Sequence, residues 1–233
     1  MTRALIFVAV TGILGAFALP ALGIAPSERD WARAGILWRV SQLTCGSTAS
    51  NKTQVSLPFT PGDSLTITLP GSVRYRPGDK AEAIVTGDAA LLDHVRLENG
   101  TLSLDCEPNS SKLEIDLTGP AIADWSLQSS ANLTLTDISQ RQLRLTITGS
   151  GNVTAAGAVE TVGLKSTGSG KAELKSLVAK SAEIETTGSG GARLTAEMNA
   201  NVLITGSGSV ELFGHPTLSR SKVTGSGRIV EAP

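Results

Sequence analysis

The chain has 233 residues, a formal net charge of −1, 25 glycines and an aromatic content of only 3%. This length allows one or two domains, and the apolar residues, mostly Leu, Val, Ile and Ala, suit thin layered cores better than one large core. Charges of both signs are scattered along the chain without a Lys/Arg cluster that could follow phosphates, so we exclude nucleic acid as a partner.

An uncharged apolar segment opens the chain. Arg3 precedes residues 4–25, which carry no charge. We predict an export signal over residues 1–23, cleaved near Gly23 after small residues, since Pro20 fits a cleavage region better than the interior of a membrane helix. The alternative is an uncleaved anchor, because about 20 apolar residues can span a bilayer. On either interpretation the protein is exported to the periplasm or cell surface, and it contacts the membrane only if the segment stays uncleaved.

Residues 24–54 are mixed in character, and we predict a tether there. In an exported protein, Cys45 and Cys106 are expected to form a disulfide, which would close a loop of about sixty residues and contribute up to roughly 4 kcal/mol. The alternative is that Cys45 carries a lipid, but it lies some twenty residues beyond the apolar segment. Two cysteines without nearby histidines are too few for a zinc site, so no metal is expected.

Residues 55–120 contain short runs in which apolar and polar residues alternate, separated by turns rich in Pro, Gly, Asn and Asp. Alternation with a period of two indicates strands. The runs are Leu65–Leu69, Ala83–Val85, Val95–Leu97, Leu102–Leu104 and Leu113–Leu117. We predict an irregular or antiparallel β section that caps the remainder of the chain, because an open stack of strands needs a cap.

From residue 121 onward one tetrapeptide, Thr-Gly-Ser-Gly, recurs at steps of 19, 20, 18 and 19 residues. The copies are Thr148–Gly151, Thr167–Gly170, Thr187–Gly190, Thr205–Gly208 and Thr224–Gly227, and a degenerate copy is Ser129–Asn132. A fixed period near 20 residues is typical of a repeat architecture.

The residues around each copy show what the repeat is. Leu143, Leu145 and Ile147 precede the first copy and Val153 follows it, all at positions of one parity. A straight strand through them would be unusually long, so we expect the two glycines to mark a bend. Each coil would then contain a strand, a Gly-x-Gly bend, a second strand and a variable return, with like residues stacked about 4.8 Å apart.

These elements predict an all-β fold over residues 55–233. It is a β-helix-like solenoid of roughly 19-residue coils, with a cap section over residues 55–120 and regular Gly-Ser-Gly coils over residues 121–233. Arg228, Glu231 and Pro233 place charge and a proline on the last strand, which discourages pairing at its edge.

The chain also resembles the bacterial GIN-domain proteins (DUF2807), a family of autotransporter adhesin head domains. The resemblance rests on Thr86–Asp88, Gly100–Leu104, the serial Gly-Ser-Gly coils and the ending Val210–Pro216. It implies a β-helix-like fold and an envelope or surface location. It implies little about activity, because fold resemblance alone does not assign a function.

We find no pattern typical of an active site or a cofactor site. His215 lies in a predicted turn, and His94 is expected to be solvent-exposed at the start of a strand. A phosphate loop around Gly168–Lys171 fails, because Lys165 stands where a first glycine is required and Ala172 where Ser or Thr should bind magnesium. The recurring serines are too regular for one activated nucleophile, so we predict a protein without enzymatic activity, cofactor or metal.

If the glycines form the bends, the neighbouring hydroxyl residues stack on the outside in two rows. We call these rows the hydroxyl ladder: Thr148, Thr167, Thr187, Thr205 and Thr224, with Ser150, Ser169, Ser189, Ser207 and Ser226. In one interpretation they only suit a solvent-facing bend. In the other they form a regular binding face for a glycan, although scarce aromatics weaken that hypothesis.

The sequence therefore predicts an exported, non-enzymatic structural or interaction protein of the bacterial envelope or surface, similar to an adhesin head. The alternative is a carbohydrate-binding module that uses the hydroxyl ladder. A hydrolase of envelope polymers is the weakest hypothesis. The expected partner is an envelope or surface molecule, with a glycan and a second copy of the chain both left open.

Overall fold

The computed structural model describes residue 45, residues 53–108 and residues 113–233. The predicted export segment 1–23 and nearly all of the predicted tether 24–54 lie outside these residues, so both remain predictions. Within the described ranges, no helix combines the length and apolar character needed to cross a membrane.

The described chain is built of strands, with one four-residue helix. The elements are β1 (Gln54–Leu57), β2 (Ser64–Ile67), β3 (Ser72–Pro77), β4 (Glu82–Gly87), α2 (Ala89–Leu92), β5 (Val95–Glu98), β6 (Thr101–Leu104), β7 (Leu113–Gly119), β8 (Asp124–Leu127), β9 (Asn132–Gly149), β10 (Asn152–Gly168), β11 (Lys171–Gly188), β12 (Gly191–Gly206), β13 (Ser209–Phe213), β14 (Thr217–Gly225) and β15 (Arg228–Glu231).

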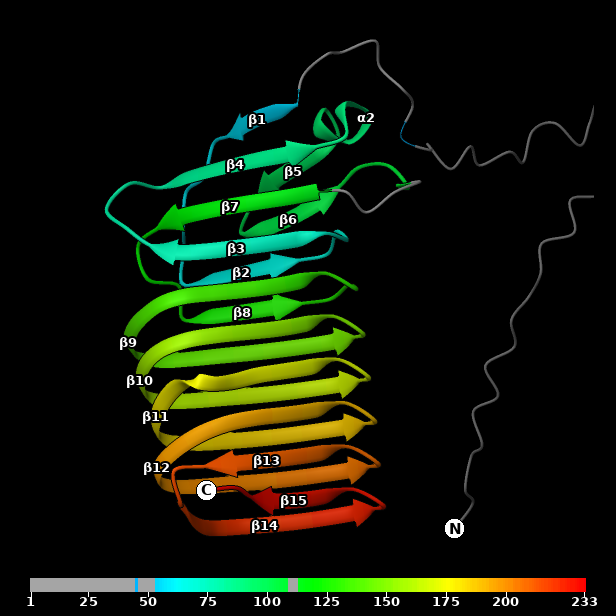
Figure 1. The fold of residues 1–233 in the computed structure, drawn as a ribbon. Coiled ribbons are helices and arrows are strands. Elements are labelled where there is room, and N and C mark those ends of the chain that lie inside the picture. Colours follow the sequence, from blue (N-terminus) through cyan, green and yellow to red (C-terminus); the bar gives the residue numbers. More distant parts are fainter. Residues whose placement is uncertain (1–44, 46–52, 109–112) are drawn as a thin grey trace, which may run out of the picture. The chain divides into compact units, whose positions relative to one another are not determined.

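The long strands β9–β12 form the regular part of the molecule. Each runs along one layer, bends, and returns along a second layer, so that one strand makes most of a coil (Figure 1). Neighbouring coils pair in parallel. This arrangement confirms the predicted all-β solenoid of roughly 19-residue coils.

We call the layer that holds the first halves of β9–β12 the entry sheet, and the layer that holds their second halves the return sheet. β13 and β15 continue the entry sheet, and β14 continues the return sheet. Because β9–β12 pass through both layers, all strands belong to one continuous 15-stranded sheet.

The Gly-Ser-Gly segments form the bend between one coil and the next, and they stack as predicted. Gly168 is in register with Gly149 on one side and with Gly188 on the other. At Gly188 the backbone has φ +117°, and an added Cβ would lie 2.4 Å from the carbonyl oxygen of Gly168. An added Cβ at Gly190 would similarly lie 2.4 Å from the Gly170 oxygen. Positive φ and close backbone contact together explain why glycine recurs here.

The opposite bend differs from the expected variable return. Pairing continues through it, and the coils shift register there as in β-bulges. In β10 the shift falls at Gly157, which has φ +136° and packs against the Ile138 backbone. In β9 Asp137 takes φ 57°. The register shifts involve one to three residues. Bulges this short leave a weak sequence signal, so the alternation alone could not distinguish them from a loop.

The core lies between the two sheets and is made of inward-facing Leu, Val, Ile and Ala. Its largest members are Trp125 and Tyr75, whose ring centroids lie 4.9 Å apart. The single proton of the Tyr75 hydroxyl is shared between the carbonyl oxygens of Gly119 at 3.0 Å and Pro120 at 2.6 Å. Burial raises the pKa of this hydroxyl.

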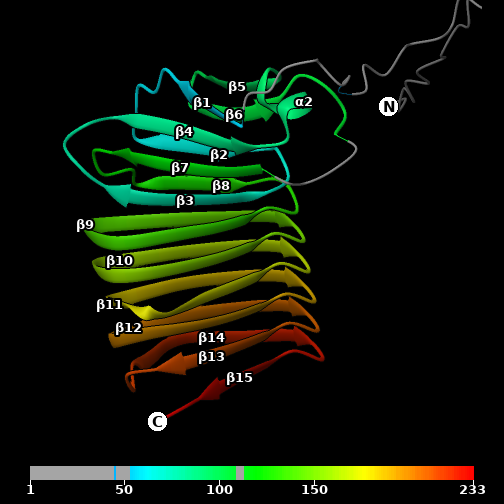
Figure 2. The same cartoon turned by 45° about the horizontal axis from the view of Figure 1, so that its top comes forward.

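The N-terminal cap does not follow chain order. β3 lies between β7 and β9, and β2 lies between β6 and β8. After β3 the chain therefore adds β4–β7 on one side of β2 and β3, and only then crosses to the other side at β8 (Figure 2). β4 pairs antiparallel with both β1 and β7, and β5 pairs antiparallel with β6. The predicted antiparallel section therefore covers the first coil.

The other end of the stack is less covered. Among the described residues, no strand pairs with the outer edges of β14 and β15. Glu231 is in register with the buried Leu212, so a carboxylate occupies a position of the inner row. Glu231 is exposed, and a charge on an exposed edge strand opposes further strand pairing.

Candidate functional site

The threonine row of the hydroxyl ladder forms one straight line across five coils. Thr167 is in register with Thr148 and Thr187, and Thr205 is in register with Thr187 and Thr224. All five are exposed. Successive strands lie about 4.8 Å apart, so the row repeats at that interval along the end of the return sheet.

The serine row is set by the backbone of the bend. The amide groups of Ser169 and Ser189 each donate at 2.9 Å to the first glycine of the preceding coil, Gly149 and Gly168 respectively. These bonds fix each serine to the coil before it. All five serines of the ladder are exposed.

None of the ten ladder hydroxyls forms a hydrogen bond to another described residue. Each hydroxyl can donate once and accept twice, so the ladder offers a dense, uncharged and regular set of groups to an external ligand. This arrangement can hold a polymer through hydrogen bonds, and it offers no group that would activate a reaction. The ladder as a binding site remains a proposal.

A second set of hydroxyls, which the sequence pattern did not distinguish from the apolar inner row, lies inside the core. Ser166 and Thr186 are 4% and 3% exposed and pair in register. The Thr186 hydroxyl has no hydrogen-bond partner among the described residues. Their positions in the alternating pattern indicated that they would be buried, but serine and threonine are residue types that usually lie on the surface.

The outer face of each sheet carries ion pairs that join successive coils. Lys165 Nζ lies 3.2 Å from Glu185 Oε2 on the return sheet. On the entry sheet Arg193 bridges Glu173 at 3.2 Å and Glu211 at 2.7 Å, which raises the pKa of the Arg193 guanidinium. Residues 18 to 20 positions apart meet here, so only the coil register reveals these pairs.

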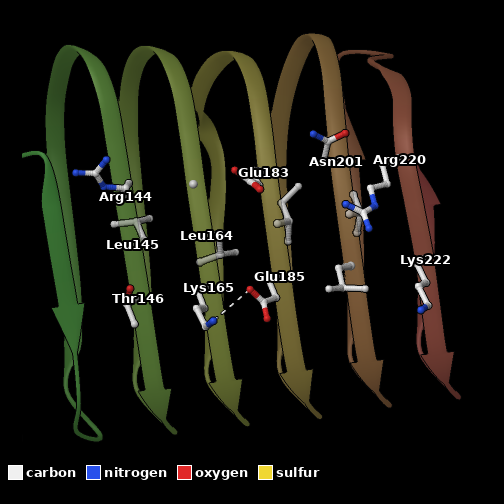
Figure 3. A pocket seen from close by; sticks show the side chains of 14 residues that line it. Arg144, Leu145, Thr146, Leu164, Lys165, Glu183, Glu185, Asn201, Arg220 and Lys222 are labelled. Atoms are coloured by element: carbon white, nitrogen blue, oxygen red, sulfur yellow. Dashed lines mark hydrogen bonds and ion pairs between the residues drawn. The ribbon is translucent and has the colours of Figure 1, made fainter.

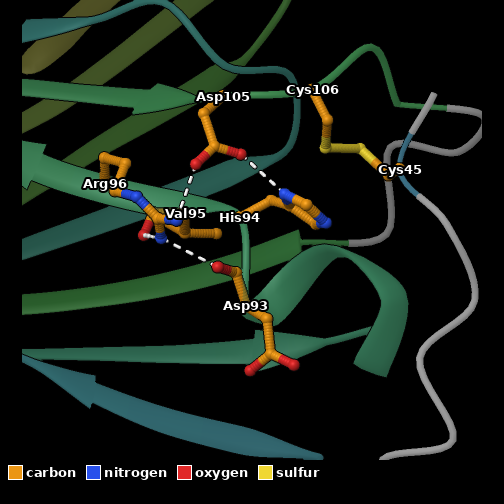
Figure 4. Close-up of polar contacts among 7 residues, drawn as sticks. All are labelled: Cys45, Asp93, His94, Val95, Arg96, Asp105 and Cys106. Atoms are coloured by element: carbon orange, nitrogen blue, oxygen red, sulfur yellow. Dashed lines mark hydrogen bonds and ion pairs between the residues drawn. A yellow bond between two sulfur atoms is a disulfide. The ribbon is translucent and has the colours of Figure 1, made fainter. Parts of the chain in front are cut away.

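His94 was expected to be exposed, but it is partly buried in a polar cluster beside the disulfide (Figure 4). Its Nδ1 lies 2.6 Å from Asp105 Oδ1, and Arg96 Nη2 lies 2.6 Å from Asp105 Oδ2. Cys106 lies within 4.8 Å of these ligand atoms, but its sulfur is bonded to Cys45. With the sulfur oxidised and the Asp105 carboxylate already bound by Arg96 and His94, these residues fit a structural polar cluster better than a metal site.

His215 lies in the turn after β13, where the sequence predicted a turn; it has φ 55° and is exposed. No described histidine or carboxylate is hydrogen-bonded to a ladder serine. The nucleophile–base contact that defines a serine triad is therefore not formed at these residues.

Two solved structures have a similar fold. One is a "putative adhesin" from Bacteroides fragilis NCTC 9343, with TM-score 0.61 and 19% identity, covering 80% of this chain and 100% of that one. The other is a "putative lipid binding protein" from Parabacteroides distasonis ATCC 8503, with TM-score 0.52 and 19% identity, covering 78% of this chain and 98% of that one. At this identity they establish the fold alone. No curated protein matches the chain. Residues 63–216 match the family model described as "Putative auto-transporter adhesin, head GIN domain".

Proposed function

The chain belongs to the GIN-domain family (DUF2807), and on that premise we propose that it is an exported, non-enzymatic interaction protein of the bacterial envelope or surface. Its role is similar to that of an adhesin head. The solenoid holds side chains at fixed intervals on a rigid surface, and the partner binds along that surface. The strands are the scaffold, and recognition depends on what their outer faces carry.

The observation that carries this proposal is the hydroxyl ladder. Ten exposed hydroxyls stand in two rows over five coils, and none is engaged within the described residues. A surface that only needed solubility would not need the same hydroxyl at the same position of every coil. We therefore propose a glycan as the ligand, because its many hydroxyls match a regular set of donors and acceptors.

Removing two central ladder hydroxyls tests this proposal. The Thr167→Val, Thr187→Val variant keeps the branched shape of both side chains and removes only the hydroxyl groups. Because each hydrogen bond contributes about 0.5–1.5 kcal/mol, we expect glycan affinity to fall by about tenfold. A glycan array followed by titration calorimetry on the exported protein would measure it.

The entry sheet offers a matched control. Thr134 and Thr154 are also neighbours in register, but on the other face. The Thr134→Val, Thr154→Val variant should bind as the wild type does. Equal glycan retention by wild type and ladder variant, or equal loss in both variants, would remove the ladder as the binding site.

A further inference from the structure

The outer face of the return sheet is hollowed beside the threonine row. The hollow has a volume of about 360 Å³ and extends over the return halves of β9–β12 and over β14 (Figure 3). It forms where outward side chains are short or absent. Gly163 stands between Arg144 and Glu183 in register, and Asn201 follows Glu183.

Three of the six charged side chains that line this hollow, Arg144, Lys165 and Glu185, form ion pairs. Arg144 is bound by Asp124 in the coil before it, and Lys165 is bound by Glu185 in the coil after it. These pairs hold the coils together and leave little charge for a ligand at that end of the hollow.

Arg220 and Lys222, on β14, are the two lining cations outside these ion pairs. Both are exposed and both line the hollow. No described residue forms an ion pair with either of them. Since alternate residues of a strand face the same side, Arg220, Lys222 and Thr224 form one outward row on β14. Two free cations therefore lie on the same strand as the last ladder threonine.

The neighbouring coil supplies an apolar side chain and an uncharged polar side chain. Leu203 is in register with Lys222 and is 37% exposed, and Asn201 is in register with Arg220. A sugar ring presents both C–H and O–H groups, so a surface with a leucine, an amide and threonines can contact both.

Glu183 limits how much negative charge the hollow accepts. It lies two coils from Arg220 in the same row, a separation of roughly 10 Å at the usual strand spacing. It has no ion-pair partner among the described residues. An acidic group held by Arg220 does not reach Glu183, but a polymer with an acid on every unit would place one against it.

We propose that Arg220 and Lys222 bind the acidic group of a glycan that carries an isolated carboxylate or sulfate, while Leu203 and the adjacent threonines contact its neutral sugars. The planar guanidinium of Arg220 can donate two parallel hydrogen bonds to such a group, and Lys222 adds a second charge. This inference rests on the proposed glycan-binding function and names the class of glycan.

The test uses an array with neutral, singly acidic and multiply acidic oligosaccharides of matched backbone and length, and vesicles of phosphatidylglycerol as a separate anionic probe. Wild-type exported protein should retain singly acidic members at least tenfold more strongly than neutral or multiply acidic ones. The Arg220→Gln, Lys222→Gln variant should bind acidic and neutral members equally, at the wild-type level for neutral members.

A variant of equal charge controls for bulk electrostatics. Lys171 and Arg228 lie in one outward row of the entry sheet, are exposed, and have no ion-pair partner among the described residues. The Lys171→Gln, Arg228→Gln variant should keep the wild-type preference. Equal loss in both variants would overturn the site.

The remaining outcomes separate this inference from the function on which it rests. Wild-type protein that binds neutral and acidic glycans equally would overturn the acidic site and leave the ladder standing. Stronger binding of multiply acidic members would contradict the role of Glu183. Retention on the vesicles without any glycan would replace the glycan by a lipid surface, and the absence of binding to all probes would overturn both proposals.

Discussion

At the scale of single residues, the core of the solenoid contains two buried hydroxyl side chains, and the hydroxyl of one of them, Thr186, has no hydrogen-bond partner among the described residues. Ser166 and Thr186 occupy an inner row that is apolar in the coils on either side, at Ile147 and Ile204. The Thr186 hydroxyl is buried without a partner. A buried polar group without a hydrogen bond costs about 1–3 kcal/mol, so this position opposes folding.

Replacing Thr186 by Val should therefore stabilise the protein. The change keeps the shape and removes the unpaired hydroxyl, and we expect the free energy of unfolding to rise by about 1 kcal/mol. Urea denaturation would measure it. Thr187→Val, one residue away and exposed, is the control and should change stability by less than about 0.5 kcal/mol. Lower stability in Thr186→Val would show that the hydroxyl has a partner.

Tyr75 offers a direct measurement inside the core, because it is the single tyrosine of the chain. Burial raises its pKa above the ordinary value of 10.0. On alkaline titration of folded protein, tyrosinate absorbance should therefore rise at a higher pH than it does in urea. The same midpoint in both conditions would contradict the buried, hydrogen-bonded position.

The sign of the effect on stability follows from this raised pKa. As the pH rises, the unfolded state loses the tyrosine proton first, because its pKa is lower. The contribution of Tyr75 to stability is therefore complete below about pH 10 and is lost as the pH rises through the folded pKa. Tyr75→Phe should remove this part of the alkaline loss.

At the scale of the coil, the bend restricts which residue is allowed at a position more strongly than the strands do. Leu, Val, Ile and Ala exchange freely along the inner rows, but the first bend glycine has positive φ in every copy. In the four copies after the first, a backbone carbonyl oxygen also lies 2.4 to 2.5 Å from any added Cβ, whereas at Gly149 the nearest oxygen lies at 3.5 Å. Sterics of this kind admit no other residue, which explains why the tetrapeptide is visible in the sequence.

Gly188→Ala should accordingly destabilise the protein by about 3 kcal/mol or more, because both φ and the Gly168 carbonyl oppose it. Gly191→Ala, three residues further along, is a matched control. There an added Cβ finds its nearest atoms at 3.6 Å, so we expect a change within about 0.5 kcal/mol. Thermal unfolding would compare the two, and equal effects would contradict the close stacking of the bends.

The bulged bends and the cap were less predictable, because no residue type is required at a fixed position in them. The bulged bends carry no fixed residue, because Gly157 and Asp137 solve the same turn in different ways. The order of the cap strands depends on pairings between distant segments, such as β3 with β7 and β2 with β8, and alternation along one strand does not identify its neighbours. The predicted runs match β2, β4, β5, β6 and β7, but they miss β1 and β3 and do not give the order of the strands.

In the candidate site, too, the features local to one bend were predictable from the sequence, and those that depend on contacts between coils were not. The hydroxyl ladder was predictable because it is local to each bend. The pairing of Lys165 with Glu185 and the free state of Arg220 and Lys222 depend on register between coils. A single sequence gives that register only after the number of residues in each bulge is known.

At the scale of the whole molecule, the disulfide between Cys45 and Cys106 ties the chain before β1 to the end of β6. The Cys45 amide also donates to the Glu107 carbonyl oxygen at 3.2 Å. The cross-link spans 61 residues, and a loop of that size contributes up to about 4 kcal/mol by restricting the unfolded chain.

The Cys45→Ser, Cys106→Ser variant should lower the free energy of unfolding by up to that amount. Urea denaturation of wild-type protein with a thiol reductant should give the same fall, and the variant should not respond to the reductant. A wild-type midpoint that is unchanged by reduction would show that the cap holds without the cross-link.

The stacking of identical coils has a consequence for how such a protein can change over time. A duplicated coil brings its own inner row, its own glycine bend and its own pair of hydroxyls, and it contacts only its two neighbours. Gene segments of one period could therefore be gained or lost without redesigning either terminus. Each event would lengthen or shorten the ladder surface by about 4.8 Å. The number of repeats in a related protein would therefore set the length of partner that its surface can bind.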